Sequence, residues 1–201
     1  HVLEPAMALP EPPRLVCHEG GLTGLLGELA VHRLDLVVSD VPAPVSLSVR
    51  VYTHLLGRTG VAFFAAPRLL QATGWTLRRA RSAFPACLAD MPLLLPSAQT
   101  ALRPRLDAWL RQHALAPLVA AEFDDSALLK AFGREGQGVF AAPAVLADEV
   151  AQQYQVQCLG TPGDLMEEFY AISVERRITH PAVAAITAAA RSKLFANPAA
   201  A

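Results

Sequence analysis

The feature that most constrains this fold is a repeated alternation between short, almost wholly apolar runs and segments with helical periodicity. Residues 34–40 and 60–66 are runs of the first kind, as expected of strands that are buried on both faces. Residues 22–30 and 102–110 carry apolar side chains at the spacing of one face of a helix. This alternation predicts an α/β fold with two Rossmann-like halves.

The rest of the chain continues the pattern. Further strands are expected at residues 14–18, 47–55, 93–95, 118–123, 139–142, 156–159 and 168–174. The arginines expected on the surface of the helix at 102–110 are Arg103, Arg105 and Arg111. A last helix should begin near Pro181. The arginine-rich segment 68–82 breaks the regularity, and we interpret it as a boundary between the two halves.

The composition limits the class of protein. Hydrophobic residues make up 53% of the 201 residues, which is enough for a sizeable core. Lys and Arg number 17 against 18 Asp and Glu, so no excess of positive charge favours DNA binding by this chain alone. No apolar run reaches the length of a membrane span, and no basic-then-apolar leader opens the chain. We therefore expect a cytoplasmic location and no membrane contact.

The three cysteines, Cys17, Cys87 and Cys158, are far apart in the sequence and odd in number. This spacing predicts free thiols in a reducing cytoplasm rather than a zinc site or a redox pair. Cys17 and His18 could be a nucleophile and its base, but neighbours on a strand point to opposite faces. A core cysteine is the favoured interpretation. The histidines lack metal-ligand spacing, so we expect no metal, no cofactor and no catalytic residue.

Two further motifs have both a functional and a structural interpretation. The glycine-rich segment 133–138 resembles a phosphate-binding loop in composition only, because it closes a helix instead of opening one after a strand. A glycine helix exit is the favoured interpretation. Arg78, Arg79 and Arg81 could form a phosphate-binding patch, but three arginines in a loop are more often solvated surface.

Polar residues follow several of the expected strands. Asp124 and Asp125 could act as paired carboxylates or simply cap the next helix, together with Ser126. The segment 97–100 lies between a strand and a helix, where free backbone N–H groups favour a polar ligand or an anion, with capping as the alternative. Ser39 and Asp40 hold the matching place in the first half, with a turn as the alternative. Open parallel sheets bind ligands at such strand ends.

The order of these elements, and several local strings, resemble the regulatory domain of LysR-type transcriptional regulators over nearly the whole chain. The strings that carry this resemblance are LDLVVSD at 34–40, SVR at 48–50, GVAFF at 60–64, FPACL at 84–88, EFDD at 122–125, ALLKAFG at 127–133 and HPAV at 180–183. They are similar in particular to the NhaR-like branch, whose members regulate sodium/proton antiporter genes.

The resemblance implies a periplasmic-binding-protein-like fold of type 2, in which two subdomains are joined by two crossover strands. Subdomain I would comprise residues 1–65 and 171–201, and subdomain II residues 66–170. The implied hinge residues are Phe64, Ala65, Tyr170 and Ala171. The sequence starts as if in the middle of a helix. We therefore expect the winged helix-turn-helix domain, the linker helix and the first strand of the regulatory domain to be absent from this chain.

The resemblance also implies a small-molecule or ion effector that binds between the subdomains. The residues implied to line this cleft are Ser39, Asp40, Ser97, Ala98, Gln99, Thr100, Phe123, Asp125, Ser126, Phe140 and Pro143. The helix at 22–33 of one subunit would pack against the helix at 102–114 of another in a homodimer, and the full-length protein would be a homotetramer. The implied interface residues are Leu25, Leu29, Leu106 and Trp109.

The resemblance thus implies an effector-sensing domain of a transcriptional activator that responds to sodium and pH and is not an enzyme. Effector binding would favour one closure angle and move remote DNA-binding domains. A periplasmic-type solute-binding protein for a small organic anion is the alternative, although three unpaired cysteines count against it. An α/β hydrolase is a weaker alternative, because no G-x-S-x-G string is present.

Overall fold

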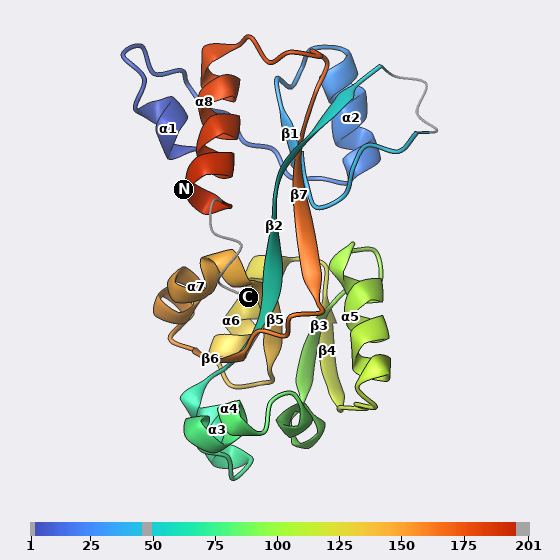
Figure 1. The fold of residues 1–201 in the computed structure, drawn as a ribbon, viewed down its shortest axis with the longest axis vertical. Coiled ribbons are helices and arrows are strands. Elements are labelled where there is room, and N and C mark those ends of the chain that lie inside the picture. Colours follow the sequence, from blue (N-terminus) through green and yellow to red (C-terminus); the bar gives the residue numbers. More distant parts are fainter. Residues whose placement is uncertain (1–2, 46–49, 196–201) are drawn as a thin grey trace. The chain divides into compact units, whose positions relative to one another are not determined.

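The computed structural model describes residues 3–45 and 50–195, which form two compact units (Figure 1). The described residues of unit 1 belong to the ranges 1–58 and 168–198, and unit 2 comprises residues 59–167. Two strands, β2 (Tyr52–Ala65) and β7 (Met166–Ser173), carry the chain from one unit to the other. The boundaries expected after residues 65 and 170 fall at the end of β2 and within β7.

Unit 1 is built on an antiparallel pair of strands, in which Val38 of β1 (Val37–Ser39) lies opposite Ala171 of β7. The helix α2 (Leu22–Ala30) packs against β1, and the short α1 (Glu4–Met7) packs against α8 (Pro181–Ala189) (Figure 1). One π-helical turn, η3 (Ala190–Leu194), continues α8. The core consists of small clusters, the largest of which holds Leu26, Leu29, Val37 and Ile172.

Unit 2 combines parallel and antiparallel strands. The strand β3 (Leu93–Pro96) pairs in parallel with β4 (Val119–Phe123), and a bridge from Leu93 to Val139 leads toward β5 (Phe140–Pro143). Both β5 and β6 (Gln157–Gly160) pair antiparallel with β2. The helices are α3 (Pro67–Ala72), α4 (Leu77–Ser82), α5 (Leu102–Gln112), α6 (Ser126–Arg134) and α7 (Ala147–Tyr154), with 3-10 turns η1 (Ala86–Asp90) and η2 (Ala144–Leu146).

Two aromatic clusters form the core of unit 2. Phe63 packs against Phe84 and Trp109, with ring centroids 5.5 Å and 5.1 Å away. On the other face of β2, Phe64 stacks on Phe140 at 5.5 Å. Because successive side chains of a strand point to opposite faces, these two neighbours serve two separate clusters. Residues 59–65 of β2 are accordingly buried throughout.

Much of the expected secondary structure is confirmed. The strands expected at 93–95, 118–123, 139–142 and 156–159 form β3, β4, β5 and β6, and the last helix begins at Pro181. The expected buried stripe of α5 is also present, consisting of Leu102, Leu106, Trp109 and Leu110. In the ranges that the structure describes, no helix has the length and apolar character needed to cross a bilayer.

Three expectations about local structure are wrong, and one helix was not predicted. Residues 14–18 form no strand, because none of the described strands pairs with them. Their backbone N–H and C=O groups therefore make no hydrogen-bond ladder of a sheet. Residues 52–55 and 60–65, from two strands expected to be separate, belong to one strand, β2, and residues 46–49 lie outside the described residues. The segment 68–82 forms α3 and α4 inside unit 2 and is no boundary. The helix α7 was not predicted, because Val150 is its one fully buried side chain.

Candidate functional site

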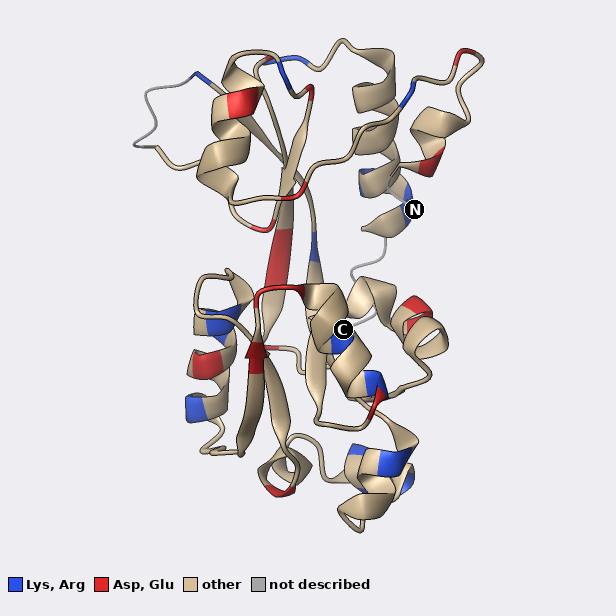
Figure 2. Cartoon of the chain, turned by 180° about the vertical axis from the view of Figure 1, so that it is seen from behind, with Lys and Arg blue, Asp and Glu red and all other residues tan. Residues whose placement is uncertain are grey.

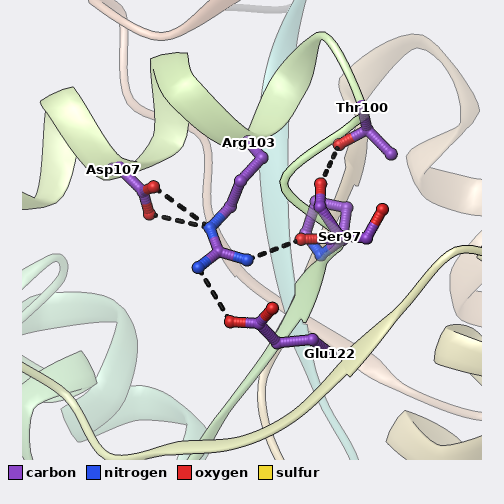
Figure 3. A network of polar contacts seen from close by, with 6 residues as sticks. Ser97, Thr100, Arg103, Asp107 and Glu122 are labelled. Carbon is purple, nitrogen blue, oxygen red and sulfur yellow. Dashed lines mark hydrogen bonds and ion pairs between the residues drawn. The ribbon is translucent and has the colours of Figure 1, made fainter.

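The turn between β3 and α5 consists of the predicted site residues Ser97, Ala98, Gln99 and Thr100. The backbone N–H of Ser97 donates to the carbonyl of Phe123 at 2.8 Å, which ties the end of β3 to the end of β4. The N–H and the hydroxyl of Thr100 both donate to the Ser97 carbonyl, at 3.1 Å and 2.9 Å (Figure 3). The Ser97 Oγ atom, in contrast, is buried and has no hydrogen-bond partner among the described residues. Such an atom is costly to leave unsatisfied and can bind a ligand.

Arg103, from the first turn of α5, holds the same region together. Its side chain is 15% exposed, and its Nη1 donates to the Pro96 carbonyl at 2.9 Å (Figure 3). Its Nε donates to Asp107 Oδ1 at 3.0 Å, and its Nη2 donates to Glu122 Oε1 at 2.8 Å. The expectation that Arg103 lies on the helix surface is therefore wrong. Asp107 follows it by one helical turn, and this spacing could have indicated the ion pair.

The charges around the turn are mainly negative. The hydrogen bond from Arg103 lowers the pKa of Glu122, and the same hydrogen bond raises the pKa of Arg103. Asp124 and Asp125 follow Glu122 after Phe123, so with Asp107 this part of unit 2 carries four carboxylates against Arg103 and Lys130. An excess of carboxylates favours a cation over an anion in this region.

The connection between β4 and α6 serves as a helix cap. Asp125 Oδ1 accepts hydrogen bonds from the N–H groups of Ala127, at 2.7 Å, and Leu128, at 3.1 Å, so the capping interpretation is confirmed. Ser126 is exposed and accepts a weak hydrogen bond from Lys130 Nζ at 3.5 Å. Burial lowers the pKa of Lys130. The ring of Phe123 packs on Phe132, with centroids 5.0 Å apart.

The remaining predicted site residues are placed less favourably for a ligand. Phe140 has no exposed area, because it fills the core against Phe64, so it cannot line an open site. Pro143 is half-buried and pairs with Val61 in the sheet. Ser39 and Asp40 belong to unit 1, at the end of β1, where Ser39 Oγ accepts a hydrogen bond from the N–H of Val41 at 3.1 Å. The structure thus brings together residues 97–100 with 122–126 in unit 2.

The predicted hinge residues lie inside the units. Phe64 and Ala65 are fully buried in unit 2, and Tyr170 and Ala171 belong to unit 1, in the part of β7 that pairs with β1. The chain enters unit 2 at Thr59, a buried residue whose hydroxyl donates to the Gly60 carbonyl at 3.1 Å and accepts from the N–H of Val145 at 3.0 Å. It re-enters unit 1 at Glu168, which pairs with Arg58 at 2.6 Å.

The predicted interface residues are also part of the core. Leu29 and Leu106 have no exposed area, and Trp109 is 2% exposed and donates from its Nε1 to Asp164 Oδ1 at 2.8 Å. Leu25 is half-buried. Side chains that are buried in their own chain offer no contact area to a partner, so a dimer formed through α2 and α5 would not use Leu29, Leu106 or Trp109.

The other motifs show no catalytic arrangement. Cys17 is exposed, which contradicts its interpretation as a core cysteine, whereas burial raises the pKa of both Cys87 and Cys158. A raised pKa disfavours the reactive thiolate. Gly136 has a φ of +66° directly after α6, which confirms the glycine helix exit. No group of three or more His, Cys, Asp or Glu that could hold a metal ion occurs in residues 3–45 and 50–195.

Residues 13–194 of the chain match the protein family described as the LysR substrate binding domain. Because the match spans most of the chain, this chain belongs to that family, whose members are regulatory domains of transcription regulators and not enzymes. The predicted family and the predicted periplasmic-binding-protein-like fold are therefore confirmed.

The chain is similar to the transcriptional activator protein NhaR of Escherichia coli (strain K12) and of Shigella flexneri. It is 34% identical to each over 194 residues, which are 96% of this chain but 61% of each relative. The solved structure of Vibrio fischeri DarR in complex with DNA has a TM-score of 0.67 at 20% identity, covering 94% of this chain and 62% of that chain. The effector-binding domain of QuiR in complex with shikimate has a TM-score of 0.58 at 16% identity, covering 86% and 78%.

Proposed function

We propose that this chain is the effector-sensing domain of a LysR-type transcriptional activator, and that the strand ends of unit 2 hold part of the effector site. The observation that carries this proposal is the Ser97 hydroxyl, which is buried without a partner among the described residues, at a turn whose backbone is hydrogen-bonded. A ligand that bonded to this hydroxyl would remove the free-energy cost of leaving it unsatisfied.

The charge around the turn supports a cation as the effector. Asp107 and Glu122 pair with Arg103 beside the turn, and Asp124 and Asp125 follow β4, so carboxylates outnumber Arg103 and Lys130 here. In line with the resemblance to the NhaR-like branch, we propose that the cation is sodium and that pH modulates the response. Residues 97–100 and Glu122 would form the part of the site that lies in unit 2.

A small organic acid is the second candidate. The N-cap residue of α5, Ala101, makes no side-chain hydrogen bond to the helix, so the first N–H groups of α5 lack a side-chain cap. Uncapped N–H groups at a helix N-terminus favour an anion. QuiR, one of the structural neighbours, binds shikimate in its solved structure.

Thermal unfolding distinguishes the two candidates. The 201-residue chain is melted with sodium, lithium or potassium chloride at constant ionic strength, and with shikimate and other organic acids, at two pH values. A ligand that binds only the folded state adds about 2.7 kcal/mol to the free energy of unfolding at a hundredfold excess over Kd. The melting temperature rises as a result. We expect a shift with sodium that potassium does not produce.

Ser97→Ala tests the site itself, with the exposed Thr23→Ala in α2 as the matched control. The sodium shift should disappear in Ser97→Ala and persist in Thr23→Ala. A shift with an organic acid alone, again dependent on Ser97, would support the second candidate. If no additive produces a shift that depends on Ser97, the site is elsewhere and the proposal fails.

The remaining parts of the proposal concern the full-length protein. DNA would be bound through an N-terminal winged helix-turn-helix domain outside this sequence, in the cytoplasm, by a homodimer or homotetramer. Effector binding would shift the equilibrium between two arrangements of subdomains I and II, with β2 and β7 as hinges.

Self-association can be tested at Val31, the C-cap residue of α2, which is 63% exposed. If α2 pairs with a second copy, Val31→Glu should yield monomers in analytical ultracentrifugation, because a buried unpaired carboxylate is unfavourable. An oligomer of unchanged mass would exclude α2 from the interface.

A further inference from the structure

A shallow depression on the surface of unit 2 shares no residue with the Ser97 site. It has a volume of about 340 Å³ and is lined by residues of α4 and of its two flanks, namely Trp75, Arg78, Arg79, Ser82 and Ala83. We call it the α4 depression. Arg78, Arg79 and Ser82 are exposed there, and Trp75 is half-buried because its inner side packs against the core of unit 2.

The helical geometry of α4 directs these side chains outward together. Ala80 is the buried residue of α4 and faces the core. At 100° per residue, positions 78 and 82 lie on the opposite side of the helix from Ala80, and position 79 lies about 100° away from it. The arginine at position 81 points elsewhere, because its Nε donates to the Cys158 carbonyl of β6 at 2.9 Å.

The two outward-facing arginines have no carboxylate partner among the described residues. Arg58, Arg68 and Arg103 each form an ion pair at 3.0 Å or less. Arg79 lies over the Trp75 ring at 5.1 Å and donates to the Gly74 carbonyl at 3.3 Å. These two contacts orient its guanidinium, but neither supplies a negative charge that would neutralise it. Arg78 makes no side-chain hydrogen bond or ion pair within the described part of the chain.

The sequence around the α4 depression adds no negative charge. From residue 41 to residue 89 the chain contains six arginines and no Asp or Glu, although the whole chain has 18 acidic residues against 17 basic ones. In Figure 2 the blue segments of α4 stand together without a red segment on the same helix. Concentrated positive charge of this kind attracts anions and raises their local concentration.

We propose that the α4 depression binds a phosphate-type oxyanion through the guanidinium groups of Arg78 and Arg79 and the hydroxyl of Ser82. Guanidinium forks match the oxygens of phosphate bidentately, and charge-assisted hydrogen bonds of this kind are about twice as strong as neutral ones. The three donors approach from different positions around one helix face, which suits a tetrahedral anion better than a planar carboxylate. The phosphate comes either from a phosphorylated small molecule or from a DNA backbone.

The test measures binding to the 201-residue chain at constant ionic strength, with pyrophosphate, a random-sequence DNA duplex and acetate as separate probes. Isothermal titration calorimetry gives the affinities, and the fluorescence of Trp75 reports contact, because the other tryptophan, Trp109, is buried. The variant is Arg78→Gln/Arg79→Gln. The matched control is Arg111→Gln on α5, an exposed arginine of the same unit.

We expect pyrophosphate or the duplex to bind, and the double variant to lose about tenfold or more in affinity. The Arg111→Gln control should stay within about twofold of the parent chain, since its charge lies outside the depression. Binding of pyrophosphate assigns the site to a small phosphorylated ligand. Binding of the duplex alone, with a salt dependence that the double variant reduces, assigns it to DNA backbone phosphates.

Three results would overturn the inference: no binding of either phosphate probe, an equal loss in Arg111→Gln, or acetate binding as tightly as pyrophosphate. Circular dichroism of the variants shows whether the fold is kept, and Ser82→Ala, which removes a single exposed donor, provides a second variant should the double change affect folding. Because the α4 depression and the Ser97 site share no residue, failure here leaves the sodium experiment unaffected.

Discussion

Unit 1 and unit 2 bury their apolar side chains in different ways. Unit 2 fills both faces of β2 with aromatic rings, among them Phe63, Phe64 and Phe140, all without exposed area. Unit 1 has three small clusters of mostly aliphatic side chains, around Leu26, Ile186 and Leu56. Since the stabilisation grows with the apolar area removed from water, unit 2 should be the more stable frame and unit 1 the part that opens more readily.

Removing the ring of Phe63 from the core of unit 2 should have the largest effect on this difference in stability between the units. Phe63→Ala leaves Phe84 and Trp109 without their shared neighbour, and such a cavity costs roughly 3–5 kcal/mol. Amide hydrogen exchange in β3 and β4 should then be faster in the variant than in the parent chain. Within the parent chain, exchange should be faster in β1 than in β3. Leu26→Ala is the control in unit 1. If β1 is already as protected as β3 in the parent chain, the proposed difference between the units is wrong.

Two helices, α6 of unit 2 and α8 of unit 1, differ in how their first turns are capped. Asp125 caps α6 through two N–H groups, whereas His180, the N-cap of α8 in unit 1, makes no side-chain cap hydrogen bond. Asp125→Ala should therefore destabilise the chain by about 0.5–2 kcal/mol in urea unfolding. His180→Ala should change the stability by much less. A larger loss at His180 than at Asp125 would show that the cap of α6 contributes little.

The smallest expected effect is a loss of stability at acidic pH. The Arg103 hydrogen bond lowers the pKa of Glu122 in unit 2, and the Thr179 backbone N–H lowers the pKa of Glu175 in unit 1. A carboxyl whose pKa is lower in the folded state stabilises the fold above the unfolded pKa and loses this contribution as the pH falls through the folded value. Melting temperatures should therefore fall on acidification below the ordinary glutamate pKa of 4.5.

Glu122→Gln and Glu175→Gln should each melt lower than the parent chain at neutral pH and approach it in acid. Salt sharpens the comparison between the units, because it screens the exposed ion pair of Glu122 more than the hydrogen bonds that Glu175 accepts at 2.9 Å and 2.8 Å. The Glu122 difference should shrink in high salt and the Glu175 difference should persist. Equal salt dependence would contradict the assigned causes.

The elements that could be predicted from the sequence are those with strong periodicity or a defined cap. The stripe of α5, the apolar strand β3 and the Asp125 cap each follow from spacing within a few residues. The helix α7 was missed because it buries Val150 but no regular stripe. Residues 14–18 have an apolar pattern but no partner strand among the described residues, and a pattern alone does not form a ladder.

The candidate site was predictable in location but not in detail. Polar residues between a strand and a helix indicated residues 97–100, because such ends present free backbone groups. The burial of the Ser97 hydroxyl and the links of Arg103 to Pro96 and Glu122 depend on contacts between distant parts of the chain. The same reason explains why Phe140, at a predicted strand end, turned out to be a core residue.

The continuity of β2 restricts how this domain can vary in length. Its side chains partly alternate in exposure from Tyr52 to Arg58 and are buried throughout from Thr59 to Ala65, within one strand of 14 residues. An inserted residue near Arg58 would turn Phe63 and Phe64 to opposite faces unless the whole upstream part shifted instead. Insertions and deletions among homologues should therefore avoid β2, and chimeric regulators assembled from two relatives should preserve its residue count.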